Sequence, residues 1–160
     1  MLKLTRLANT ILLPLTVALP VLALDNIGIK RAEVPPAALG TAKYYAPGVT
    51  FTRYAYEDEN GIRIYEFESH DSEGRHIEVD VLADGTLQEI EMEKHWDETP
   101  VAVQFELTIG HSGFIPTFIE ASIRPDGTTV YEFEGIDKNG AFADYEILDN
   151  GPTVKLLAAW

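Results

Sequence analysis

The chain has 160 residues, of which 26 are acidic and 12 are basic, so its formal net charge is -14 at pH 7. This excess of negative charge disfavours nucleic acid as a partner, and the absence of cysteine excludes disulfides, thiol nucleophiles and zinc–thiolate sites. With 46% hydrophobic and 10% aromatic residues, the composition is that of a globular protein rather than a disordered one.

The amino-terminal residues have the pattern of a secretory signal peptide. Basic residues precede an apolar run over residues 11–24, and small and aliphatic side chains occur around Ala23. We therefore expect residues 1–23 to be a cleaved signal peptide and residues 24–32 to be a linker. A membrane anchor is the alternative, but the run contains prolines and is shorter than the roughly 20 residues that span a bilayer. The sequence thus predicts a periplasmic or secreted protein without a stable membrane anchor after cleavage.

The rest of the chain contains one unit written twice. Residues 33–91 can be aligned with residues 98–157 at an offset of 65, which becomes 66 after the first hairpin. The strongest anchor is the segment Tyr-Glu-Phe-Glu, which occurs once in each copy. A duplication explains this match better than chance does. We accordingly divide the mature chain into repeat 1 over 33–93, a connector over 94–98 and repeat 2 over 99–160.

Each repeat begins with a helix signal. Pro35 and Pro100 suit the first position of a helix, where the missing N–H group is not needed. In repeat 1, residues 35–46 have apolar side chains at helical spacing, and Pro47-Gly48 ends the helix. In repeat 2 two signals conflict, because apolar and polar residues alternate over residues 101–109 as they do in a strand. We expect a helix there as well, since the repeat and the Thr-Pro start both favour one.

Runs of alternating residues separated by glycine turns follow each predicted helix. Asn60-Gly61, Asp84-Gly85 and Asn139-Gly140 are typical of tight hairpins, in which glycine supplies the positive φ. Such turns predict four antiparallel strands in each repeat. The expected fold class is therefore α+β, with two tandem repeats, each a helix followed by a four-stranded antiparallel meander. We expect the two sheets to adjoin and both helices to lie on one face.

Strand alternation predicts that carboxylates share the sheet face opposite the helices, because successive side chains point to opposite sides. An antiparallel sheet commonly has one wet face, and acids there keep an exported protein soluble. The sharper interpretation is a docking surface for a protein partner with a basic surface. Under that interpretation, the candidate partner-binding residues are Glu66, Glu68, Glu78, Asp80, Glu132, Glu134, Asp144 and Glu146.

No motif in the sequence names a reaction. His70 and His76 flank a predicted hairpin as a metal pair would, but Ile136 and Phe142 take their places in repeat 2, which favours a packing role. Two Asp-x-Asn-Gly segments resemble the start of a calcium loop without its later glutamate. The sequence contains no nucleophile elbow, phosphate loop or dinucleotide fingerprint. We expect no enzyme, and we assign no catalytic residue, cofactor or metal ligand.

The repeated unit resembles the PepSY-like domain, which is also described as β-lactamase-inhibitor-like. The likeness rests on the Val-Pro or Thr-Pro helix start, the Pro-Gly helix end, the Tyr-Glu-Phe-Glu strand and the Asp-x-x-Gly turn, and it covers residues 33–157. Repeat 2 departs from the pattern where Ser112 replaces the proline. The resemblance implies an exported module whose tandem units clasp a protein with a joined concave sheet. It implies no catalytic residue and no cofactor.

Taken together, these patterns predict an exported, non-catalytic binding module that binds or inhibits a protein, for which a peptidase or another hydrolase is the family-based candidate. The alternative is the binding or buffering of cations, calcium above all, which the net charge suggests. A third hypothesis, an enzyme with an unrecognised carboxylate pair, requires a deep pocket between the two repeats. The identity of the partner and the oligomeric state are left open by the sequence.

Overall fold

The structure is a computed structural model that describes residues 26–151. The predicted signal peptide and the last predicted strand of repeat 2 therefore lie outside the described residues. Within residues 26–151 the elements follow in this order: β1 (Ile27–Gly28), η1 (Arg31–Glu33), α1 (Pro36–Tyr45), β2 (Arg53–Glu59), β3 (Ile62–His70), β4 (His76–Leu82), β5 (Leu87–Glu93), η2 (Trp96–Glu98), α2 (Val101–Gly110), β6 (Ile115–Ile123), β7 (Thr129–Ile136) and β8 (Phe142–Leu148). The two η elements are short 3-10 helices.

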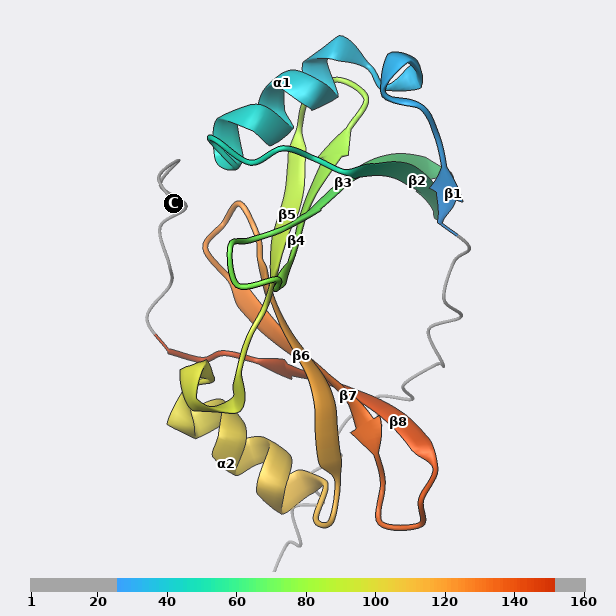
Figure 1. The fold of residues 1–160 in the computed structure, drawn as a ribbon. Helices are drawn as coiled ribbons and strands as arrows, with labels where there is room; N and C mark the ends of the chain where they lie inside the picture. The colour runs from blue at the N-terminus through green and yellow to red at the C-terminus, as the bar shows by residue number, and fades with distance from the viewer. Residues whose placement is uncertain (1–25, 152–160) are drawn as a thin grey trace, which may run out of the picture.

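All of these strands belong to one antiparallel sheet, in which each strand pairs with the next along the chain from β1 to β8. Figure 1 shows that the sheet is strongly twisted, with α1 near one end of the sheet and α2 near the other. Helix α1 packs on β4, and α2 packs on β8. Among the described residues, no helix is long and apolar enough to span a membrane.

The predicted fold class is wrong in this respect: the chain does not form two tandem helix-plus-four-strand units. It forms a single, mostly β meander, because β5 pairs with β6 across the supposed boundary through Ile90↔Ile123 and Met92↔Ala121. The Lys94 N–H group extends this pairing by donating to the Ile119 carbonyl at 2.8 Å. In addition, β1 joins the sheet before α1, and only three strands follow α2 in the described part.

A physical reason for this correction lies in the strand edges. An unpaired edge strand exposes a row of backbone N–H and C=O groups, and pairing of β5 with β6, which follows it after η2 and α2, satisfies these groups. Turn signals mark where strands begin and end, but they do not show whether two neighbouring sheets abut or merge. The duplication is visible in the matching helices and not in separate domains. Helices α1 and α2 have the same length and begin 65 residues apart.

Helix α2 forms where the sequence signals conflict. Its alternating apolar residues divide between two faces of the helix rather than two faces of a strand. Val103 and Leu107 are buried, whereas Val101 is 79% exposed and Phe105 is 66% exposed. The alternation of apolar and polar residues over 101–109 therefore does not indicate a strand.

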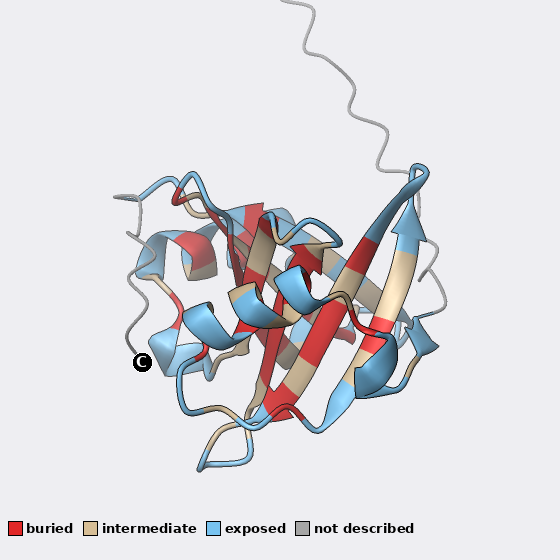
Figure 2. Cartoon of the chain, turned by 90° about the horizontal axis from the view of Figure 1, so that it is seen from above, coloured by how far each residue is buried: buried red, intermediate tan, exposed pale blue. Residues whose placement is uncertain are grey.

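Two apolar clusters fill the space between the sheet and the helices, and Figure 2 shows their buried residues as bands along the strands beneath the helices. The cluster under α1 includes Phe67, Val79 and Ile90. The cluster under α2 includes Leu107 and Phe133. Because strand residues alternate between faces, the neighbours of these core residues point to the opposite side of the sheet.

Candidate acidic binding face

The sheet face turned away from the helices carries carboxylates on β2 to β8, and we call it the acidic face. Its position follows from strand alternation, because residues such as Val79 and Phe133 point into the apolar clusters and their neighbours do not. All eight residues proposed from the sequence lie on it. Its carboxylates are Glu57, Glu59, Glu66, Glu68, Glu78, Asp80, Glu89, Glu91, Glu93, Glu120, Glu132, Glu134, Asp144 and Glu146.

Strand register places these carboxylates opposite one another across neighbouring strands. Like charges in directly opposed positions of a sheet are destabilising, so the arrangement carries an energetic cost. The opposed pairs are Glu66↔Asp80, Glu68↔Glu78, Glu78↔Glu91, Asp80↔Glu89, Glu93↔Glu120, Glu120↔Glu132, Glu132↔Glu146 and Glu134↔Asp144.

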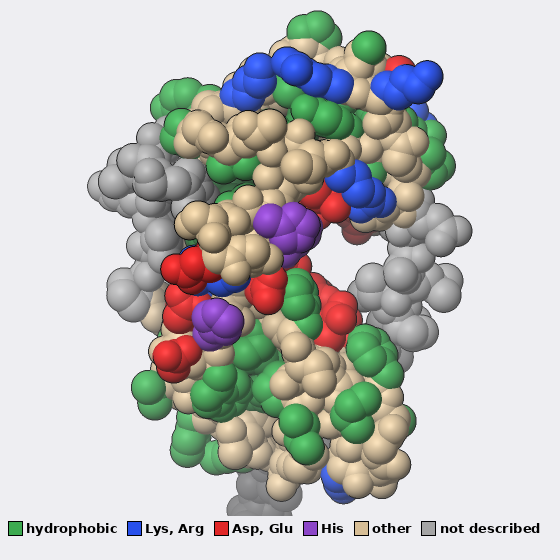
Figure 3. Space-filling model, in the orientation of Figure 1, with side chains coloured by type: hydrophobic (Ala, Val, Ile, Leu, Met, Phe, Trp, Pro, Cys, Tyr) green, Lys and Arg blue, Asp and Glu red, His purple; other side chains and the backbone are tan. Residues whose placement is uncertain are grey.

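The acidic face is not uniformly open to solvent. Glu66, Glu78 and Asp80 are buried, Asp80 with 8% of its surface exposed, whereas Asp144 and Glu146 on β8 are exposed. Glu68, Glu132 and Glu134 are intermediate. Figure 3 shows acidic side chains, in red, gathered near the middle of the molecule. The candidate residues thus range from buried at the centre of the sheet to exposed at β8.

Few cationic groups accompany these carboxylates. His76 Nδ1 lies 3.0 Å from Glu120 Oε1, and His76 Nε2 lies 3.6 Å from Glu78 Oε2 and 3.8 Å from Glu68 Oε2. Arg53 pairs with Glu68 at one side of the face, and Arg124 Nε lies 3.5 Å from Glu89 Oε2. Among residues 26–151, these three residues supply the ion pairs of the acidic face.

Burial and mutual repulsion raise the pKa values of several of these groups. Burial is the main cause for Glu66, whose pKa rises to about 8, with repulsion from neighbouring carboxylates adding to the effect. The same causes raise the pKa of Glu78 to about 7 and that of Glu91 to about 9, and they raise the pKa of Asp80 well above its usual value. The hydrogen bond with Glu120 raises the pKa of the His76 imidazole.

Two carboxylate oxygens at the centre of the face have no hydrogen-bond partner within the described part of the chain. They are Glu66 Oε2 and Asp80 Oδ1, and both are buried. Buried polar atoms are almost always satisfied in folded proteins, so unsatisfied ones require an explanation. Side chains from two groups could hold a metal ion here: Glu68, His76 and Glu78 form one, and Glu78, Asp80 and Glu91 form the other.

A second concave feature lies on the helix side of the sheet. It is a pocket of about 670 Å³ lined by residues that include Val49, Ile77, Met92 and Lys94. This volume falls within the range of small-molecule sites. The sequence offers no signal for this pocket, because the end of α1, the β3–β4 turn and η2 meet only in the folded chain.

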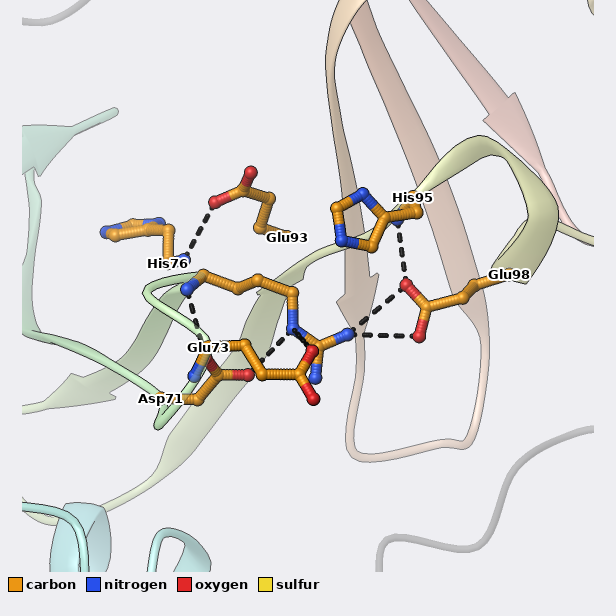
Figure 4. A network of polar contacts seen from close by, with 7 residues as sticks. Asp71, Glu73, His76, Glu93, His95 and Glu98 are labelled. Carbon is orange, nitrogen blue, oxygen red and sulfur yellow. Dashed lines mark hydrogen bonds and ion pairs between the residues drawn. The ribbon is translucent and has the colours of Figure 1, made fainter.

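A polar network ties one side of this pocket together. Figure 4 shows Asp71 and Glu73, near the β3–β4 turn, and Glu98 of η2 pointing toward a common centre. Arg75 occupies it, with Nε 2.7 Å from Asp71 Oδ2 and Nη1 3.0 Å from Glu98 Oε1. Hydrogen bonds from backbone N–H groups lower the pKa of Asp71 and that of Glu98, and the Arg75 side chain adds to the effect in both cases. The network joins the first half of the sheet to the segment that leads into α2.

Sequence reasoning overlooked the part that His76 and Glu120 play. The structure does place His70 and His76 opposite each other across the β3–β4 hairpin, with ring centroids 5.9 Å apart. The imidazole of His76, however, contacts carboxylates from β3, β4 and β6. Only the pairing of β5 with β6 brings Glu120 within reach, and the sequence predicted adjoining sheets without specifying which strands pair.

No protein-family model matches this chain, and no curated protein matches it. The likeness to the PepSY-like domain therefore rests on the motifs of the sequence alone.

Proposed function

We propose that this is an exported, non-catalytic protein that binds a protein partner through the acidic face. Basic side chains of the partner then supply the cations that the face lacks. The observation that carries the proposal is the accumulation of opposed carboxylates on one face with few cations of their own, which reaches the exposed Asp144 and Glu146 on β8. Complementary charge across an interface favours association and selects against wrong partners.

The exposed end of the acidic face supports docking of a large partner. Asp144 and Glu146 on β8 are exposed, and Phe142 and Leu148 beside them on the same strand expose 67% and 48% of their surfaces. Two exposed acids are thus flanked by two exposed apolar side chains on one strand, which suits an interface that combines charged and apolar contacts. Exposed apolar side chains contribute nothing to the binding of a small cation, whereas a protein partner can bury them.

The environment of two carboxylates that line the pocket, Asp71 and Glu98, supports a non-catalytic function. A catalytic acid and base pair requires two carboxyl groups in environments that push their pKa values apart. Asp71 and Glu98 are instead both bound to Arg75, and both have a lowered pKa. This arrangement is typical of a structural ion pair.

Export and the class of partner come from the sequence. The signal-peptide pattern over residues 1–23 supports a periplasmic or secreted location. The resemblance to the PepSY-like domain supports a peptidase or another hydrolase as the bound protein, which would be restrained by the complex.

Charge reversal at the exposed end of the face tests the proposal without disturbing the buried groups. The test variant is Asp144→Lys/Glu146→Lys, and the matched control is Asp97→Lys/Glu106→Lys, which makes the same charge change at exposed positions of η2 and α2. Wild type and both variants are immobilised and used to capture proteins from an extract of periplasmic or secreted proteins.

If the acidic face is the interface, wild type and the control variant retain a protein that the test variant does not retain. We also expect this protein to be released at high salt, because exposed ion pairs are screened. Capture of the same proteins by all three baits would show that the acidic face is not the interface.

A further inference from the structure

Three carboxylates meet at the irregularity between β4 and β5. Glu78 and Glu91 are opposed across the two strands, and Asp80 lies two residues beyond Glu78 on the same face. The register shifts between Asp80 and Val81, as it does at a β-bulge, and bulges re-aim side chains. One carboxylate oxygen from each of the three residues lies within 4.8 Å of the other two.

Independent support for a ligand comes from the unsatisfied oxygens. Asp80 is 8% exposed, contributes its carboxylate to this group, and has Oδ1 buried without a hydrogen-bond partner among the described residues. Its cross-strand neighbour Glu66 is 3% exposed, and Glu66 Oε2 is likewise buried without a hydrogen-bond partner among the described residues. Buried carboxylates are normally paired with cations or coordinate metals, and these have neither a lysine nor an arginine beside them that satisfies the free oxygens.

We propose that Glu78, Asp80 and Glu91 bind one calcium ion. An all-oxygen, carboxylate-rich set suits a hard cation, and calcium accepts irregular coordination by six to eight oxygens at about 2.3–2.6 Å. Magnesium demands near-ideal octahedral geometry at about 2.0–2.1 Å, which a set of side chains around a bulge does not favour. The remaining ligands would be second carboxylate oxygens and water.

The neighbouring group of Glu68, His76 and Glu78 is a poorer candidate. Its imidazole would favour zinc or another transition metal. His76 Nδ1, however, is 3.0 Å from Glu120 Oε1. The ring lies between the carboxylates of Glu68, Glu78 and Glu120, where the protonated imidazole takes the place of a bound cation. The imidazole already neutralises that side of the cluster, whereas Asp80 has no such partner.

A calcium ion at this position would join β4 to β5 where their register shifts, and it would neutralise the most buried part of the acidic face. Since protons and calcium compete for the same oxygens, binding should tighten as pH rises. The exposed carboxylates of Asp144 and Glu146 on β8 are not part of this group. Failure of calcium binding would therefore leave the docking proposal standing, and failure of docking would leave the calcium site standing.

The test is equilibrium dialysis of the purified, chelator-stripped protein against calcium at about physiological ionic strength, where weak attraction to the overall charge is screened. Asp80→Asn and Glu91→Gln are the test variants, because both keep the shape of the side chain. Glu106→Gln on the exposed side of α2 removes the same charge far from the acidic face and serves as the control. Thermal unfolding of each metal-free variant checks that it folds.

Wild type and Glu106→Gln should bind one calcium ion per chain and melt about 5–15 °C higher at a calcium concentration near 100 times the dissociation constant. Asp80→Asn and Glu91→Gln should weaken binding at least about tenfold and lose most of this melting shift. Equal binding by wild type and Asp80→Asn would overturn the assignment. Tighter binding of zinc than of calcium, with loss in His76→Gln, would overturn it as well.

Discussion

Glu66 on β3 and Asp80 on β4 lie directly opposite each other, and each has one buried carboxylate oxygen without a hydrogen-bond partner in the described part of the chain. Two anionic groups in this relationship repel each other and lose their hydration, so the folded state favours protons or cations at this place. The same relationship links the stability of the protein to pH and explains why a cationic ligand would bind here.

Stability of the metal-free protein should fall as pH rises from about 5 to about 9. Because the folded-state pKa values of Glu66, Glu78 and Glu91 are about 8, 7 and 9, against an ordinary value of 4.5, the folded state binds more protons than the unfolded state in this interval. The expected loss of unfolding free energy is about 2–5 kcal/mol, measured by urea denaturation in the presence of a chelator. A flat or rising stability over this range would contradict the buried acidic cluster.

At low pH a different set of groups should limit stability. The pKa values of Asp71 and Glu98 lie below their ordinary values, through backbone N–H groups first and the bonds to Arg75 as well. Their contribution is present above the unfolded pKa and disappears as pH falls through the folded pKa. The stability maximum is therefore expected at about pH 4.5–6.

Glu66→Gln should stabilise the metal-free protein at about pH 8.5. The substitution removes a buried charge that lacks a hydrogen-bond partner for Oε2, and it keeps the size of the side chain. We expect a gain on the order of 1 kcal/mol in urea denaturation, which shrinks at about pH 5 where Glu66 is protonated. Glu106→Gln on α2 is the control and should change little. A loss of stability at high pH would show that the Glu66 carboxylate has a partner in solution.

His76→Gln should destabilise the protein more at about pH 6 than at about pH 9. The imidazolium stands among Glu68, Glu78 and Glu120, and its pKa is raised, so its stabilisation is fully present below the unfolded pKa of 6.5 and is lost as pH rises through the folded pKa. The expected cost at the lower pH is about 1–3 kcal/mol in chemical denaturation. The control His95→Gln, at an exposed position, should show a small cost at both values. Equal costs for His76→Gln at the two pH values would contradict the ion pairs.

Two alanine substitutions on α2 test how this helix faces the sheet. Leu107 is buried in the cluster under the helix, so Leu107→Ala should cost about 2–5 kcal/mol of unfolding free energy. Phe105 is exposed, so Phe105→Ala should change stability by about 0.5 kcal/mol or less. Thermal or urea unfolding gives both values. Similar costs at the two positions would mean that the alternating residues form a strand or that the outer side of α2 is covered.

The sequence predicted the parts of the fold that depend on local signals. Asn60 and Gly61 both have positive φ angles in the turn between β2 and β3, as the Asn-Gly hairpin signal requires. Proline at the start and the repeat identified α2 despite its alternating residues. Alternation along each strand also placed Glu66, Glu78 and Glu132 on one face.

The parts that depend on distant pairing were not predictable from one sequence. Nothing local shows that Ile90 pairs with Ile123, and this pairing decides that the sheet is single and that Glu120 reaches His76. Nor does alternation show how strongly a face is buried, so Asp80 and Asp144 looked equivalent in the sequence. The structure separates them into a buried and an exposed carboxylate because they lie on a central and an outer strand of the described sheet.

The most direct test of the central claim is the affinity of a captured partner for wild type and for Asp144→Lys/Glu146→Lys, measured by calorimetry at about 50 mM and about 500 mM salt. If the acidic face is the interface, wild type binds at least about tenfold more tightly than the variant at low salt, and the difference narrows at high salt as the charges are screened. Equal affinities at low salt would contradict the claim that this face binds the partner.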